Sequence, residues 1–250
     1  MTRPLPTARG VSPLDDVESV TLVDATGSER VRGTVRPTFP APALHIARNY
    51  CTKGRAMSEK RIVVGISVAS GPQYGIRLLQ VMRELGVETH LVVSKASRRN
   101  IVLETDWAVE DVEKLAAVNY DIEDVGAAIA SGSFLTDGMV VAPCSVKSAS
   151  AIANSYNENL LIRAADVILK ERRNLILLFR ETPLHKGHLD IMRRCADLGA
   201  LMLPPMVALY HRPQSVEEII DQTVGKALDA LGIEHDLFRR WKGSDISVVK

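Results

Sequence analysis

The sequence is poor in aromatic residues and carries almost no net charge. Phe, Trp and Tyr make up 4% of the 250 residues, too few for the stacking platform on which single-stranded nucleic acids bind. The formal net charge of +1 provides no overall field toward nucleic acid or an anionic membrane. No apolar run approaches the ~20 residues that a membrane-spanning helix needs. We therefore expect neither nucleic acid nor a membrane as a partner.

Cysteine is also scarce. Cys51, Cys144 and Cys195 are scattered and form no Cys-x-x-Cys pair, a pattern typical of a reducing compartment rather than of a disulfide framework. We therefore expect a cytoplasmic protein. His185 and His188 in HKGH have the i,i+3 spacing of metal ligands, but no third ligand accompanies them, so we expect no metal site.

The N-terminal part differs in composition from the rest of the chain. It is rich in proline, arginine and threonine and has no sustained periodicity. It lacks the apolar run of a secretory signal, and its acidic residues argue against an organellar transit peptide. The stretch VESVTLVDATG is compatible with a short, isolated strand. We predict a mobile extension over 1–57, a folded domain over 58–243 and a tail over 244–250. A start codon placed too far upstream would also produce such an extension.

Strands and helices are predicted to alternate from Arg61 onward. Hydrophobic residues make up 46% of the chain, enough for one α/β domain with a sizeable core. We expect strands at 61–67, 87–94, 138–145 and 174–182, and a short one within 200–210. Helices are expected at 72–85, 95–105, 108–118, 123–133, 146–156, 158–172, 188–199 and 215–232. This alternation predicts a doubly wound parallel sheet in a three-layer αβα arrangement.

The predicted strands end in small, polar or charged residues. Four such ends are SVASG, VVSKAS, APCSVKS and FRETP, and ligands of doubly wound sheets bind at the carboxyl ends of the strands. Helix starts offer free N–H groups for an anion, and hydroxyls come from Ser67, Ser70, Ser94, Ser145 and Ser148. The convergence of four ends is stronger evidence than one loop, because small residues between a strand and a helix are also common packing devices.

A series of segments resembles the UbiX/Pad1 flavin prenyltransferases. They are GISVASGPQYGIRLL, SKAS, LETD, PCSVKSASAI, RAADVILKERR, RETPLHKGHL, MLPP and YHRPQS, followed by Trp241. The resemblance spans nearly all of 61–241 and implies a flavodoxin-like fold, assembled as a homododecamer with sites at subunit junctions. It implies a metal-independent transferase that joins the dimethylallyl group of dimethylallyl phosphate to N5 and C6 of reduced FMN. Prenylated FMN then serves a UbiD-type decarboxylase.

The resemblance also implies roles for single residues. FMN would be bound by Val68, Ala69, Ser70, Ser94, Ser145, Val146, Lys147, Ser148 and Arg180. The prenyl phosphate would be held by Tyr210 and Lys226, joined by Arg163 and Lys170 of a neighbouring subunit. Catalytic roles would fall to Glu181 as a proton relay, to Ser70 at the leaving phosphate, to the cations Arg163 and Lys170, and to Glu104 and Trp241, which line the site.

Several of these residues have simpler interpretations. Arg163 and Lys170, seven apart on one helix, also fit a solvated face, and Tyr210 and Lys226 fit ordinary surface positions. Arg180 and Glu181 also fit a structural ion pair. Further alternatives are a local cap for Glu104, a core cap for Trp241, and helix N-caps for Ser94 and Ser145, a role compatible with flavin binding.

One position departs from the family pattern, whose loop usually has Gly-Ala-Ser-Gly where this chain has Val68-Ala69-Ser70-Gly71. A positive φ would strain valine. Either the backbone is ordinary there and Val68 packs along the flavin, or FMN binding is weakened. Two rival functions stay open at this point: a flavin-dependent cysteine decarboxylase of the same superfold and a non-catalytic FMN-binding homologue. The choice between dimethylallyl phosphate and pyrophosphate also stays open.

Overall fold

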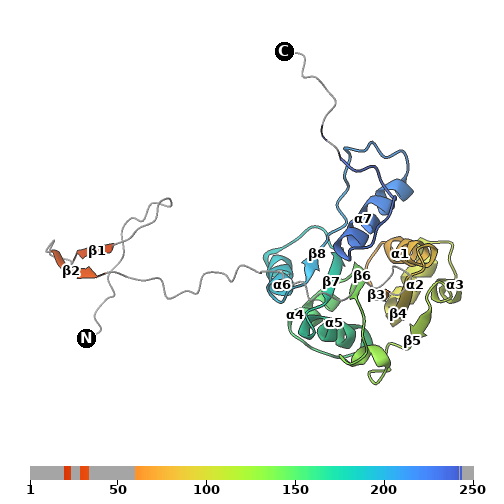
Figure 1. The fold of residues 1–250 in the computed structure, drawn as a ribbon, viewed down its shortest axis with the longest axis horizontal. Coiled ribbons are helices and arrows are strands. Elements are labelled where there is room, and N and C mark those ends of the chain that lie inside the picture. The colour runs from red at the N-terminus through yellow and green to blue at the C-terminus, as the bar shows by residue number, and fades with distance from the viewer. Residues whose placement is uncertain (1–19, 24–28, 34–59, 242, 244–250) are drawn as a thin grey trace, which may run out of the picture. The chain divides into compact units, whose positions relative to one another are not determined.

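The computed structural model describes residues 20–23, 29–33, 60–241 and 243, and the chain divides into two compact units, Met1–Thr52 and Lys53–Lys250 (Figure 1). In the first unit, β1 (Val20–Val23) pairs antiparallel with β2 (Glu29–Gly33). The expectation of an isolated strand was therefore wrong; the partner ERVRG contains a single apolar residue and gives little strand signal. The rest of the predicted extension, apart from Lys60, and the tail over 244–250 lie outside the described residues.

The second unit is built on a parallel sheet of six strands. They are β3 (Arg61–Ile66), β4 (Glu88–Val93), β5 (Val118–Tyr120), β6 (Gly138–Cys144), β7 (Asn174–Phe179) and β8 (Leu201–Met202). Their order across the sheet is β5-β4-β3-β6-β7-β8, so the chain winds one way from β3 and then the other way from β6. The predicted doubly wound sheet is confirmed, and its switch point lies between β3 and β6.

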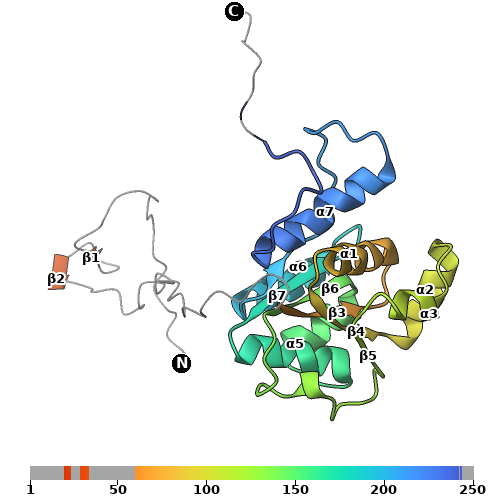
Figure 2. The ribbon, with the colours of Figure 1, turned by 45° about the vertical axis from the view of Figure 1, so that its right-hand side comes forward.

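Helices cover both faces of the sheet. They are α1 (Pro72–Glu84), α2 (Lys95–Glu104), α3 (Val109–Glu113), α4 (Val146–Ala153), α5 (Leu160–Lys170), α6 (Lys186–Asp197) and α7 (Val216–Ala230). One apolar cluster joins the sheet to α1 and α7 and the other joins it to α4 and α5, which gives the three expected layers (Figure 2). Over the residues that the structure describes, no helix combines the length and hydrophobicity needed to cross a bilayer.

Two short elements differ from the sequence prediction. The helix expected at 123–133 is a single 3₁₀ turn, Ala128–Ala130, flanked by irregular chain. The two glycines of that stretch, Gly126 and Gly132, disfavour a longer helix. The strand β5 was not expected, because its three residues lie at a sheet edge and are largely exposed, so they carry no apolar pattern.

Helix α1 packs unusually close to the sheet at Gly75. A Cβ at this position would lie 2.3 Å from the carbonyl oxygen of Ala142 in β6, so only glycine allows the approach. Gly71, with φ of 93°, is the N-cap residue directly before the helix. These two glycines place the start of α1 at the carboxyl end of β3, beside β6.

Candidate functional site

Ser67 connects the two strands at the switch point. Its hydroxyl donates to the carbonyl oxygen of Pro143 at 3.0 Å and accepts from the main-chain N–H of Ser145 at 2.8 Å. Its own N–H also donates to Pro143, at 3.2 Å. The side chain is buried, so these bonds are shielded from water. The ends of β3 and β6 are therefore held in a fixed relation, and the loops that follow them share one edge of the sheet.

The loop after β3 keeps an ordinary backbone at Val68. Among the described residues other than glycine, φ is positive only at Ser155, Arg172 and Arg212. Valine therefore brings no strain to this loop, which supports the first of the two alternatives for Val68. Its side chain is 37% exposed and is free to contact a ligand.

Residues of α2 hold the rest of this loop. Asn100 donates through Nδ2 to the carbonyl oxygen of Ala69 at 3.2 Å. One oxygen of Glu104, Oε2, accepts from the Ser70 hydroxyl at 3.0 Å and from the Gly71 N–H at 2.8 Å. Sequence reasoning missed Asn100, although its i,i+4 spacing to Glu104 places both on one helix face. Glu104 thus caps another helix, α1, rather than its own.

Ser94 and Ser145 are helix N-caps, as the alternative interpretation predicted. Ser94 caps α2 by accepting from the N–H of Ser97 at 3.2 Å, and Ser145 caps α4 by accepting from the N–H of Ser148 at 3.1 Å. The first N–H groups of each helix have no intrahelical acceptor and point toward the carboxyl edge of the sheet. Val146 and Lys147 supply two of these groups in α4, while the Lys147 ammonium pairs with Glu158 at 3.1 Å.

Arg180 follows β7 at the same edge. Its N–H donates to the carbonyl oxygen of Cys144 at 3.0 Å, but within the described part of the chain its guanidinium has no hydrogen bond or ion pair. Glu181 is exposed and accepts through Oε1 from the N–H of Thr182 at 3.0 Å. The structure therefore shows no Arg180–Glu181 ion pair, and Arg180 is a cation available to an anionic ligand.

Tyr74 of α1 is a further candidate for the site, which sequence reasoning missed. Burial raises the pKa of its hydroxyl, and the positive charge of Arg180 acts in the opposite direction. Tyr74 stands in the first turn of α1, directly after the loop, and that position was the available signal.

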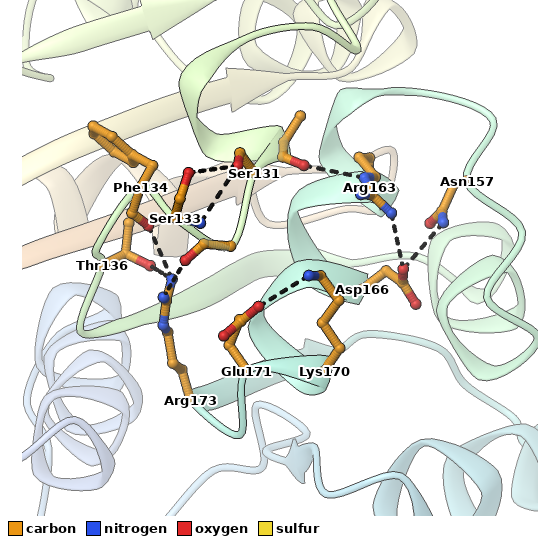
Figure 3. A network of polar contacts seen from close by, with 12 residues as sticks. Ser131, Ser133, Phe134, Thr136, Asn157, Arg163, Asp166, Lys170, Glu171 and Arg173 are labelled. Carbon is orange, nitrogen blue, oxygen red and sulfur yellow. Dashed lines mark hydrogen bonds and ion pairs between the residues drawn. The ribbon is translucent and has the colours of Figure 1, made fainter.

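Arg163 lies in the first turn of α5 and Lys170 is its last residue. The Arg163 guanidinium contacts Asp166 at 3.3 Å, and the Lys170 ammonium contacts Glu171 at 2.9 Å (Figure 3). Lys170 ends α5 just before the amino end of β7, whereas Arg180 follows the carboxyl end of that strand. A single chain therefore does not bring Lys170 and Arg180 together.

Among the described residues of one chain, neither Lys226 nor Tyr210 forms a hydrogen bond or a ring contact with Arg180. Lys226 lies one turn before the end of α7. This end of the helix lies beside the amino end of β7, because the carbonyl oxygen of Ala230 accepts from Asn174 Nδ2 at 3.2 Å. Its ammonium lies 3.7 Å from Asp229. Tyr210 is exposed and meets Trp241 edge to face, with ring centroids 6.0 Å apart.

Comparison with known proteins identifies the family. A family model described as Flavoprotein matches residues 51–228. The flavin prenyltransferase UbiX of Thauera aromatica is 56% identical over 185 residues, which are 74% of this chain and 95% of that protein. The chain belongs to the flavoprotein family, as one of its UbiX/Pad1 flavin prenyltransferases. The resemblance inferred from the sequence segments is thereby confirmed, and so is the enzyme class, a transferase.

Solved structures of UbiX proteins share the fold. The crystal structure of AnUbiX (PadA1) in complex with FMN and dimethylallyl pyrophosphate has a TM-score of 0.73 at 44% identity, covering 74% of this chain and 99% of that one. A dodecameric FMN-dependent UbiX-like decarboxylase from Escherichia coli O157:H7 has a TM-score of 0.72 at 45% identity, covering 73% and 100%. The expected flavodoxin-like α/β fold of this flavin prenyltransferase is confirmed.

Two candidate chemistries find no support in the described side chains. Burial raises the pKa of the Cys144 thiol far above its usual range, which disfavours the thiolate that a nucleophile needs. The imidazoles of His185 and His188 lie 3.6 Å apart, but no group of three His, Cys, Asp or Glu side chains with metal-binding geometry occurs among the described residues.

Proposed function

We propose that this flavin prenyltransferase joins the dimethylallyl group of dimethylallyl phosphate to N5 and C6 of reduced FMN. The observation that carries the proposal is the convergence at one sheet edge of the 67–71 loop, two helix N-termini and Arg180, whose guanidinium has no partner among the described residues, in a chain of this family. The product, prenylated FMN, would serve a UbiD-type decarboxylase, and both steps would take place in the cytoplasm.

The carboxyl edge of the sheet fits FMN. The guanidinium of Arg180 and the N–H groups that begin α2 and α4 suit its phosphate. The loop at Val68, Ala69 and Ser70 offers a strain-free apolar side chain and a hydroxyl for the uncharged ring. The Ser70 hydroxyl donates to Glu104 at 3.0 Å, so its contact with a leaving phosphate requires this hydrogen to turn away from Glu104.

The prenyl phosphate needs cations from more than one subunit. Phosphate leaves carbon readily only when its charge is neutralised, and Lys226, Lys170 and Arg163 provide suitable groups. Because Lys170 and Arg180 lie at opposite edges of one subunit, a complete site requires a neighbouring copy. We therefore propose a homo-oligomer, of the dodecameric kind seen for the Escherichia coli relative, with sites at its subunit junctions.

Glu181 and the aromatic pair complete the proposed chemistry. Ring closure at C6 expels a proton, and the exposed carboxylate of Glu181 is a suitable acceptor. Trp241 and Tyr210 are 64% and 47% exposed, and their rings are available as an electron-rich wall for an allylic cation.

The mass of the recovered flavin tests the proposal. The full chain is incubated anaerobically with chemically reduced FMN and either dimethylallyl phosphate or dimethylallyl pyrophosphate, and the flavin is then extracted. A flavin heavier by one prenyl group supports prenyl transfer, and the better donor settles the leaving group. Recovery of unmodified, bound FMN from both incubations contradicts prenyl transfer and favours a non-catalytic FMN-binding homologue. Loss of CO₂ from a peptide with a C-terminal cysteine, tested separately, would instead favour a cysteine decarboxylase.

A matched pair of arginine variants tests the FMN site. Arg180→Gln is expected to lose most FMN affinity, because it removes the cation at the carboxyl edge of the sheet. Arg193→Gln removes an exposed arginine that pairs with Asp197 at 2.7 Å and is expected to bind FMN as the unchanged chain does. Equal FMN binding by the two variants would contradict the placement of the phosphate near Arg180.

A further inference from the structure

Asp229, in the last turn of α7, is the centre of a polar cluster. Its carboxylate accepts two hydrogen bonds from the Arg240 guanidinium, at 2.8 Å to Oδ1 and at 3.2 Å to Oδ2. Nδ1 of His235 accepts from the Leu237 N–H at 3.2 Å, so the hydrogen of the neutral ring is on Nε2 and is donated to Asp229 Oδ1, also at 3.2 Å. The His235 side chain is 2% exposed. The carboxylate of α7 is therefore held mainly by the chain that follows this helix.

The segment after α7 lies directly against the helix. A Cβ at Gly225 would lie 2.5 Å from Cε1 of Phe238 and 2.6 Å from Cε1 of His235, so a side chain at this position would displace both rings. Two cations lie over the Phe238 ring, with Lys226 Nζ 5.4 Å and Arg240 Cζ 5.5 Å from its centroid. One aromatic ring and one carboxylate therefore fix where both cations lie.

Lys226 is oriented by this cluster but not bonded to it. Its ammonium lies 3.7 Å from Asp229 Oδ2, which is longer than a hydrogen bond. The Arg240 guanidinium takes both oxygens of Asp229 and holds the pKa of that carboxyl below its usual range. The Lys226 side chain is 47% exposed. Its ammonium therefore keeps its hydrogens for an anionic ligand.

The same cluster leads to the aromatic pair. Arg240 directly precedes Trp241, whose ring meets that of Tyr210 edge to face at 6.0 Å between centroids. The bidentate contact with Asp229 therefore lies one residue away from the aromatic contact. Three residues that the proposed function assigns to the prenyl phosphate site are connected in this way within one chain. They are Tyr210, Lys226 and Trp241.

We propose that Asp229 and Arg240 are positioning residues for the binding of dimethylallyl phosphate. This inference rests on the proposed function and adds the pair that prepares one subunit's share of the site. By taking both oxygens of Asp229, Arg240 leaves the Lys226 ammonium to the phosphate, and its own fixed position holds Trp241 against Tyr210. Without Arg240, the Asp229 carboxylate pairs with Lys226 and neutralises the cation that the phosphate needs.

Binding of dimethylallyl phosphate to the full chain loaded with oxidised FMN tests this role. Because the proposed transfer uses reduced FMN, calorimetric titration of the oxidised complex measures binding without reaction. Arg240→Gln is expected to bind dimethylallyl phosphate about 3- to 50-fold more weakly than the unchanged chain, since the Lys226–Asp229 pair must be broken and Trp241 must be ordered on binding.

A double variant separates positioning from a general loss of structure. Asp229→Asn with Arg240→Gln removes the carboxylate that captures Lys226, so it is expected to bind dimethylallyl phosphate about 2- to 5-fold more tightly than Arg240→Gln alone. Arg239→Gln is the matched control. Arg239 is exposed and forms no hydrogen bond or ion pair within the described part of the chain, so this variant should bind as the unchanged chain does. Equal weakening by the two arginine variants, or no gain in the double variant, would overturn the proposal.

The anisotropy of tryptophan fluorescence gives a measurement that does not depend on the prenyl ligand. Trp107 and Trp241 are the two tryptophans of the chain, so a Trp107→Phe background leaves Trp241 alone. Its anisotropy in the flavin-free chain should fall in Arg240→Gln and not in Arg239→Gln; equal values would overturn the role of the pair in holding Trp241. If the unchanged chain binds no dimethylallyl phosphate, the proposed function fails and the positioning role fails with it. A failure confined to the variants leaves the proposed function standing.

Discussion

The hydroxyl oxygen of Ser67 accepts a hydrogen bond from the main-chain N–H of Ser145 at 2.8 Å, across the switch point of the sheet. Two segments 78 residues apart in the chain are joined here by one buried side chain. The start of α4 and the loop before α1 therefore keep a constant separation, which a ligand that contacts both requires.

The first prediction concerns this contact. Ser67→Ala leaves the Ser145 N–H buried without its acceptor and is expected to lower the free energy of unfolding by about 1–3 kcal/mol. The control Ser133→Ala alters an exposed serine that contacts Ser131 at 2.9 Å and should change stability little. Urea unfolding measures both. Equal stability of the two variants would show that the Ser67 contact is not stabilising.

The second prediction concerns the N-terminal unit, which we expect to be dispensable. A chain that begins at Met57 should have the melting midpoint and FMN affinity of the full chain, because it keeps Lys60, whose Nζ donates to the carbonyl oxygens of Gly232 at 2.6 Å and Leu231 at 3.2 Å. A chain that begins at Arg61 lacks these bonds and should melt lower. Loss of soluble protein or of flavin in the Met57 chain would refute the prediction.

The third prediction tests whether sites are shared between subunits. Lys170→Ala and Lys226→Ala are each expected to abolish most activity. Co-expression of the two variants should restore activity, because one subunit then supplies Lys170 and another supplies Lys226. If the two kinds of subunit assemble at random, up to about a quarter of the sites contain both lysines. Light scattering gives the oligomeric state alongside the activity. A fully active monomer, or no recovery in assemblies shown to contain both variants, would contradict a shared site.

The fourth prediction assigns the ring-closure proton to Glu181. Glu181→Gln keeps an oxygen that can accept from Thr182 N–H, so FMN should still bind. The bond at N5 should still form, since departure of the phosphate depends on cations and not on this carboxylate. Closure at C6 should slow by roughly 10²–10⁴-fold, the usual contribution of a general base. Absorbance spectra or an NMR signal from the C6 proton distinguish the open and closed products. An unchanged closure rate would leave the released phosphate as the base.

The fifth prediction is a loss of stability in acid through His90. The side chain is buried, with Nε2 2.9 Å from Glu88 and Nδ1 2.9 Å from the Tyr120 hydroxyl. Burial lowers the pKa of His90 below 6.5, the charge of Arg61 lowers it further, and Glu88 partly opposes this. The unfolded chain therefore binds a proton at a higher pH than the folded chain, so stability decreases as the pH falls through 6.5 toward the folded-state pKa.

Comparison with His90→Gln isolates this effect. Glutamine can hydrogen-bond with the same neighbours but does not titrate. Between about pH 7.5 and 5.5, on either side of the usual histidine pKa, the melting midpoint of the unchanged chain should fall further than that of the variant. Parallel curves would show that His90 does not contribute to the pH dependence.

The sequence by itself determined the features that depend on neighbouring residues. The β-branched runs of β3, β4 and β6, the amphipathic pattern of α1 and the serine caps of α2 and α4 are local, because periodicity and capping act within a few residues. The strand ends that carry Ser94, Ser145 and Arg180 followed from the same pattern, since each stands directly after a predicted strand.

Only the tertiary structure decided which distant residues meet. The pairing of β1 with β2, the capping of α1 by Glu104 of α2, and the lack of a partner for the Arg180 guanidinium within the described residues depend on strand order and helix packing, which no local propensity specifies. The same holds for the position of Lys170 at the sheet edge opposite Arg180. Each of these relationships joins segments far apart in the chain, and their geometry follows from how the whole core closes rather than from the residues beside them in sequence.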